Sequence, residues 1–91
     1  MIEQILIVGT GLLGASTGLA LRWHGFAGDV VGWDQDAAAL DTALRLGALT
    51  SVAQEPLSAA KEADLILLAG PVLAIVDWMC RLAEVLAHIS S

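Results

Sequence analysis

Short, unbroken apolar runs alternate along the chain with longer segments that have helical spacing. The apolar runs lack the period of two that a half-exposed strand shows, which is typical of parallel strands covered on both faces. The predicted strands cover residues 4–8, 30–34, 48–52 and 65–69. The predicted helices cover residues of about 11–24, 37–46, 57–63 and 72–88.

Residues suited to helix ends stand at several of these boundaries. Asp36 is a good N-cap for the second helix, and Pro56 suits the first turn of the third. Gly25 suits the position after the first helix. Within that helix, Gly14 and Gly18 are four apart, so they share one face and permit close approach to the sheet.

The order of elements is an alternation of strand and helix, repeated four times. With right-handed crossovers, this order predicts an α/β fold of the Rossmann-like, doubly wound kind, with a parallel sheet of strand order 3-2-1-4. The first and fourth strands are then neighbours where the winding reverses, and their carboxyl ends form a binding crevice.

A glycine-rich turn joins the first strand to the first helix. Its residues are Gly9, Thr10, Gly11, Leu12, Leu13 and Gly14. An acid, Asp34, ends the second strand 20 residues after Gly14. This combination is the dinucleotide-binding fingerprint. The backbone N–H groups of Leu12, Leu13 and Gly14 lie at the positive end of the helix, where they can donate to phosphate oxygens.

The three glycines have different expected roles. Gly9 permits the tight turn, Gly11 allows a pyrophosphate to approach the backbone, and Gly14 allows the helix to pack on the sheet. The alternative is a glycine turn that merely caps a buried strand, with Asp34 as an ordinary turn acid.

Asp34 also bears on the choice of cofactor. Its carboxylate is expected to accept hydrogen bonds from the adenosine ribose and to repel a 2′-phosphate, which favours NAD over NADP. Gln35 beside it adds no positive charge. Gly70 and Pro71 follow the fourth strand at the crevice, where Gly70 is expected to bring backbone close to the cofactor's ribose. A plain strand-to-helix turn is the alternative for these two residues.

The composition excludes some classes of binding partner. The 91 residues suffice for one small domain, and 57% of them are hydrophobic, so part of the surface is expected to meet a partner. The net charge of −6, with four Lys and Arg, argues against nucleic acid and anionic membranes. A secretory signal is not expected, because Glu3 stands where a positive segment would be needed.

The remaining candidate residues receive structural interpretations. The single cysteine, Cys80, fits a reducing compartment, and hence the cytoplasm, and is expected to be a buried hydrophobe. His24 is expected to be a solvent-facing helix cap. No metal site is expected, because neither histidine has a ligand at suitable spacing. The three tryptophans are expected to pack on helix ends or sheet faces without forming a stacking series.

Several stretches resemble the prephenate and arogenate dehydrogenase family, and together they span essentially the whole chain. They are the strand and glycine turn of residues 5–16, with its Gly-Leu-x-Gly-x-Ser extension, and residues 18–22, 25–26, 30–34 and 63–72. Gly70 departs modestly from the family's pattern. The resemblance implies NAD(P)-linked oxidative decarboxylation in tyrosine biosynthesis, with a histidine as base and arginines that bind carboxylates.

Residues that match the family's histidine motif, its arginines and its helical dimerisation domain are not found in these 91 residues. The expectation is therefore a partial NAD(P)-binding domain over residues 1–91, truncated after about four strands, with no catalytic residue and no activity of its own. A small-molecule substrate is expected only in a full-length enzyme. An exposed sheet edge or apolar face is expected to produce a homo-oligomer.

Two other classes remain open. One is another NAD(P) dehydrogenase with the same opening, such as a β-hydroxyacid dehydrogenase or an imine reductase. The other is a nucleotide-sensing Rossmann module without chemistry. The choice between prephenate and arogenate also stays open.

Overall fold

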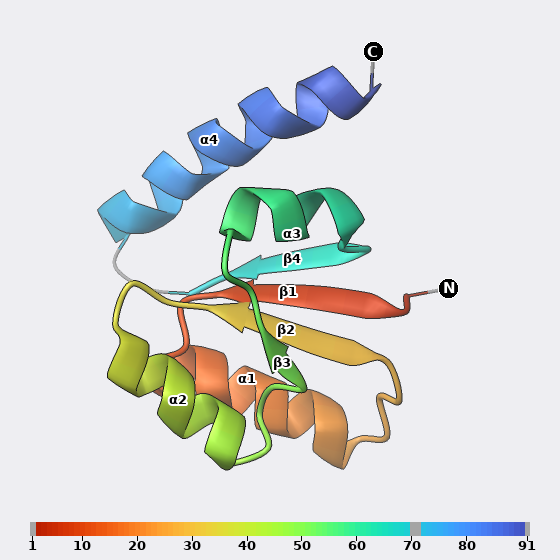
Figure 1. Cartoon of the computed structure of the whole chain (residues 1–91), viewed down its shortest axis with the longest axis vertical. Helices are drawn as coiled ribbons and strands as arrows, with labels where there is room; N and C mark the ends of the chain where they lie inside the picture. The colour runs from red at the N-terminus through yellow and green to blue at the C-terminus, as the bar shows by residue number, and fades with distance from the viewer. Residues whose placement is uncertain (1, 70–71, 91) are drawn as a thin grey trace.

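Four parallel strands form one sheet in a computed structural model that describes residues 2–69 and 72–90. Figure 1 shows α1 and α2 on one face of the sheet and α3 and α4 on the other. The elements are β1 (Gln4–Val8), α1 (Leu12–Trp23), β2 (Asp29–Trp33), α2 (Ala37–Arg45), β3 (Ser51–Val52), α3 (Pro56–Glu62), β4 (Leu65–Leu68) and α4 (Val72–Ser90).

The strand order is β3-β2-β1-β4, which confirms the predicted order and fold class. Ile5 of β1 lies between Val30 of β2 and Leu65 of β4 in the register. The winding reverses between β1 and β4, so the carboxyl ends of these two strands border the crevice that such sheets use for ligands.

Strand β1 is buried on both faces, as its unbroken apolar run predicted. Ile5 and Ile7 pack into a core on the side of α1 and α2, and Leu6 and Val8 pack into a second core under α3 and α4. All four side chains are at most 3% exposed. The two cores hold the helices against the sheet through the hydrophobic effect.

The predicted helix ends hold to within about two residues. Asp36 caps α2, with its carboxylate accepting hydrogen bonds from the N–H groups of Ala38 and Ala39. Pro56 occupies the first turn of α3, where its missing N–H costs nothing. Helix α1 ends at Trp23, with Gly25 following at a φ of +90°.

The third strand is shorter than predicted, Ser51–Val52 rather than residues 48–52. Ala48 and Leu49 are instead buried in the core beside α2, at 0% and 3% exposure. Gly18 packs here too, because a Cβ on it would overlap the carbonyl oxygen of Ala48. Close approach at Gly18 was correctly expected, but its partner is this loop and not the sheet.

Helix α4 overturns one prediction. Cys80 is exposed, not buried. Trp78 and the buried Leu82 face the sheet and α3. Cys80 is two positions from each of them, which places it about 200° around the helix, on the opposite side. Trp78 also meets Trp33 edge to face, with ring centroids 5.3 Å apart. Trp33 and Trp78 therefore pack against each other, and this single edge-to-face contact is not a stacking series.

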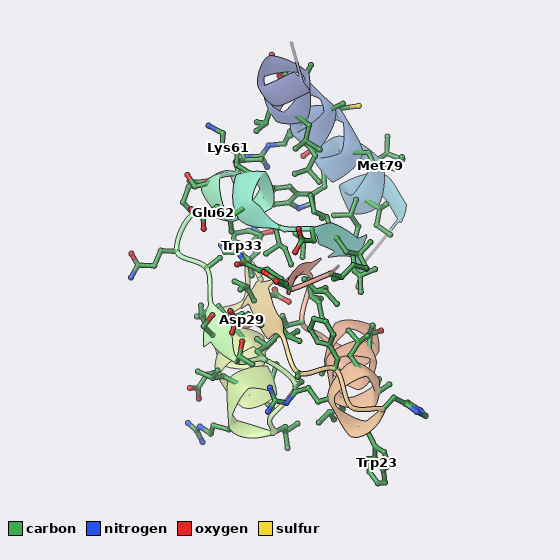
Figure 2. The ribbon with its side chains drawn as sticks, turned by 90° about the vertical axis from the view of Figure 1, so that its right-hand side faces the viewer. Trp23, Asp29, Trp33, Lys61, Glu62 and Met79 are labelled. Carbon is green, nitrogen blue, oxygen red and sulfur yellow. The ribbon has the colours of Figure 1, made fainter. Side chains whose placement is uncertain are left out.

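Trp23 lies alone at the end of α1. It is 88% exposed and points away from the body of the molecule (Figure 2). Within residues 2–69 and 72–90, no helix has the length and apolar character needed to cross a membrane.

Candidate functional site

The site begins at the turn between β1 and α1. Gly9 has a φ of +98°, a conformation that L side chains rarely adopt. Its N–H donates to the carbonyl oxygen of Trp33 at 2.8 Å, and a Cβ on it would overlap the carbonyl oxygen of Ala69. The turn is therefore wedged between the ends of β2 and β4, and glycine is required there by the fold itself.

Gly14 and Gly11 differ in what surrounds them. A Cβ on Gly14 would overlap the carbonyl oxygen of Gly9, so α1 lies directly against the turn. A Cβ on Gly11 would meet no heavy atom within 4 Å. Gly11 is also exposed and has an ordinary φ of −67°. No contact among the described residues requires glycine at this position, whereas a ligand lying against the backbone would.

The amino end of α1 lies beside that open space. Ala15 N–H makes the helix's first backbone bond, to Gly11 O at 2.9 Å. The N–H groups of Leu12, Leu13 and Gly14 precede it and have no partner within the helix. The first turn holds no acid, and Gly11 supplies no side-chain cap. These N–H groups lie beside the space at Gly11, at the positive end of the helix. They therefore suit a diphosphate, which carries negative charge and oxygen acceptors.

Asp34 follows β2 and reaches the same turn. Its Oδ2 accepts hydrogen bonds from the backbone N–H and the hydroxyl of Thr10, at 2.6 and 3.1 Å. Its Oδ1 accepts from Asp36 N–H at 2.7 Å. The carboxylate is thus part-buried and held in one orientation at the crevice.

The two segments of the fingerprint, which are far apart in the sequence, therefore meet in space. Thr10 joins them, and neither the backbone bond nor the side-chain bond of that contact was predicted from the sequence. The sequence signal that could have revealed it is a hydroxyl residue between the first two glycines, followed by an acid at the end of the second strand.

The other candidate residues lie as follows. Gln35 is exposed beside Asp34. Gly70 and Pro71 lie outside the described residues, but Ala69 N–H donates to Val8 O at 2.8 Å, so β4 runs beside β1 up to the crevice. His24 is exposed at the carboxyl end of α1, the opposite end from the glycine turn, as predicted.

Arg45 and Arg81 make their contacts away from the glycine turn and Asp34. Arg45 pairs with Asp41 at 2.5 Å, within α2. Arg81 lies 4.5 Å from the ring centroid of Trp78 and 3.9 Å from an oxygen of Asp77. In the described part of the chain, no group of three or more His, Cys, Asp or Glu side chains could hold a metal ion.

A second acid, Asp64, lies at the other end of the strands, where β1 and β4 begin. Its Oδ2 accepts hydrogen bonds from the N–H groups of Glu3 and Gln4, at 2.8 and 3.0 Å. These two bonds hold the pKa of the Asp64 carboxyl below its usual value, because they favour the charged form. The bonds tie the amino ends of β1 and β4 together, which is a structural role.

Known proteins support the same assignment of fold. The family model described as "Prephenate dehydrogenase, nucleotide-binding domain" matches residues 17–90. A prephenate dehydrogenase from A. aeolicus, solved with hydroxyphenyl propionate and NAD+, is similar over 98% of this chain and 30% of its own, with 26% identity and a TM-score of 0.76. The arogenate dehydrogenase of Synechocystis is similar over 88% of this chain and 28% of its own, with 28% identity and a TM-score of 0.75.

Proposed function

Because the chain belongs to the prephenate dehydrogenase family, through its nucleotide-binding domain, we propose that the glycine turn and Asp34 bind NAD. The observation that carries the proposal is the open space at Gly11, beside unpaired helix N–H groups and within one residue of the Thr10–Asp34 contact. The relative from A. aeolicus was solved with NAD+, which supports the same cofactor.

In this proposal each part of the site has one task. The N–H groups of Leu12, Leu13 and Gly14 donate to the diphosphate, and Asp34 accepts from the adenosine ribose. Gln35 lies beside that ribose in this proposal. Gly70 and Pro71, which fall outside the described residues, are kept as proposed cofactor-binding residues because they follow β4 in the sequence. NAD is preferred to NADP because a 2′-phosphate would face the Asp34 carboxylate, and Gln35 carries no compensating charge.

We assign the oxidative decarboxylation to a longer protein, of the length of these relatives, and not to the 91 residues alone. This chain spans about 30% of the A. aeolicus chain and 28% of the Synechocystis chain. We propose that residues 1–91 form part of the cofactor-binding domain of an enzyme that oxidatively decarboxylates prephenate or arogenate in tyrosine biosynthesis. NAD supplies the hydride acceptor. We expect no turnover by the 91 residues alone, since His24 lies at the far end of α1 from the site.

We further propose that the chain self-associates through the edge of β4 and the outer face of α4. Leu65 at that edge is 38% exposed, and Val76 and Met79 on α4 are 51% and 57% exposed. Cys80 accompanies them on the exposed surface of α4. We also propose a cytoplasmic location, since a chain with a single cysteine fits a reducing compartment.

The test is a calorimetric titration of the chain with NAD and with NADP. Saturable binding with a lower Kd for NAD is expected. A folded chain that binds neither nucleotide would contradict the proposal for these 91 residues.

A further inference from the structure

The Asp34 carboxylate has more protein partners than the fingerprint requires. A carboxylate offers about four acceptor positions. Three are taken here: two on Oδ2, by the N–H and the hydroxyl of Thr10, and one on Oδ1, by Asp36 N–H. The carboxylate is therefore fixed before any ligand arrives, and its remaining acceptor position is on Oδ1.

The Thr10 hydroxyl is the part of this arrangement that depends on side-chain identity. The other two donors are backbone groups, which any residue except proline would supply. Thr10 is 3% exposed, so its hydroxyl exchanges little with water. A hydrogen bond to a charged acceptor in such a place is among the stronger ones in proteins.

We propose that Thr10 is a positioning residue that sets the preference for NAD over NADP by holding the Asp34 carboxylate with its hydroxyl. The inference rests on the proposed NAD site. Discrimination against a 2′-phosphate depends on how closely and how rigidly the negative charge faces it. Without the hydroxyl, the carboxylate keeps only its two backbone N–H bonds and is held less firmly where it would face the phosphate.

The experiment compares Thr10→Val, Thr10→Ser and the wild type by calorimetric titration with NAD and NADP. Valine keeps the shape and removes the donor, whereas serine keeps the donor. Loss of one hydrogen bond to a charged group predicts that the ratio of the NADP Kd to the NAD Kd falls about tenfold in Thr10→Val. Thr10→Ser is expected to keep the ratio within about twofold of wild type.

Two further variants separate positioning from general loosening of the fold. Thr50→Val removes a different hydroxyl, on an exposed residue that bonds the backbone of Val30 near the other end of β2, and is expected to leave the ratio unchanged. In a chain that carries Asp34→Ala, adding Thr10→Val is expected to change the ratio no further, because the group that Thr10 positions is gone.

The outcomes distinguish this inference from the proposed function. A wild type that binds neither nucleotide overturns both. If the wild type prefers NAD and Thr10→Val has the same ratio of Kd values, only the role of Thr10 is overturned. The same conclusion follows if adding Thr10→Val to the Asp34→Ala chain lowers the ratio as much as it does in the wild type. Circular dichroism of the cofactor-free variants checks folding, and Thr10→Ala replaces Thr10→Val if the latter does not fold.

Discussion

At the scale of the residue, the three glycines of the turn differ in what surrounds them. Gly9 and Gly14 avoid overlaps with backbone carbonyl oxygens of the protein itself. Gly11 faces open space, so the fold itself does not require glycine there, and in the proposed site its lack of a side chain leaves room for the diphosphate. Substitution at Gly11 therefore separates binding from stability.

Gly11→Val is expected to weaken NAD binding by at least about tenfold, because the side chain fills the space next to the helix N–H groups. The melting temperature of the cofactor-free chain should change little. Calorimetry and thermal denaturation measure the two effects. Ala27→Val adds bulk at an exposed position beyond the other end of α1 and should leave both unchanged. Undiminished binding in Gly11→Val would place the diphosphate elsewhere.

Asp64 makes stability depend on pH in the acid range. Its pKa is lower in the folded chain than in the unfolded chain, where the ordinary value is 3.8. Its stabilising contribution is therefore present above about pH 3.8 and is lost as the pH falls through the folded-state pKa. Asp64→Asn should lower the urea midpoint at pH 7 and reduce the loss of stability in acid.

Urea unfolding at pH 7 and at several acid pH values measures this dependence. Glu62→Gln, which neutralises an exposed carboxylate of α3, serves as the control and should keep the acid dependence of the wild type. An unchanged acid profile in Asp64→Asn would show that ionisation of Asp64 does not contribute to the loss of stability in acid.

At the scale of the element, α4 packs on the rest of the molecule through one face, which carries Trp78 and Leu82. Leu82 is buried, and Trp78 packs against Trp33, while Val76 and Met79 face outward. Figure 2 shows Trp33 on the side of the sheet that faces α4, and Met79 on the outer side of the helix. The aromatic pair therefore joins α4 to the carboxyl end of β2, next to Asp34.

Trp78→Ala is expected to lower the free energy of unfolding by about 2 kcal/mol, from lost burial and the lost aromatic pair. Trp23→Ala is a matched control, since Trp23 is 88% exposed, and should change it by less than about 0.5 kcal/mol. Urea unfolding followed by circular dichroism measures both. Equal effects of the two substitutions would show that the pair does not anchor α4.

At the scale of the whole molecule, the sheet has two unlike edges. One is β3, with two residues; the other is β4, an uncharged apolar strand of four residues. An apolar edge without charged residues invites pairing with another chain. Beside it, the outer surface of α4 carries Val76 and Met79.

The wild-type chain is therefore expected to have at least twice the mass of one chain in solution, by light scattering. Leu65→Lys on the edge and Met79→Lys on α4 should shift the mass towards one chain, because a buried unpaired charge is costly. Trp23→Lys, at an exposed apolar position on the far side of the sheet, should not. A wild type of single-chain mass at micromolar concentration would contradict self-association.

The fold class and most of the element bounds could be predicted from the sequence, because they follow from local patterns. Unbroken apolar runs identified the strands, although only β1 and β2 are largely buried, and Asp36, Pro56 and Gly25 marked helix ends. The predicted third strand was too long, because Ala48 and Leu49 are buried in the core and do not pair as a strand. No local sequence pattern distinguishes an apolar residue buried in a loop from one in a strand.

The sequence by itself determined that a glycine turn and an acid stand where a doubly wound sheet would bring them together, since spacing and residue type are local properties. Tertiary structure decided which contacts result. It joined the Thr10 hydroxyl to Asp34, paired Trp33 with Trp78, tied Asp64 to the start of β1 and left Cys80 exposed. Each of these depends on where two distant segments meet and on which way a helix face turns, and packing sets both.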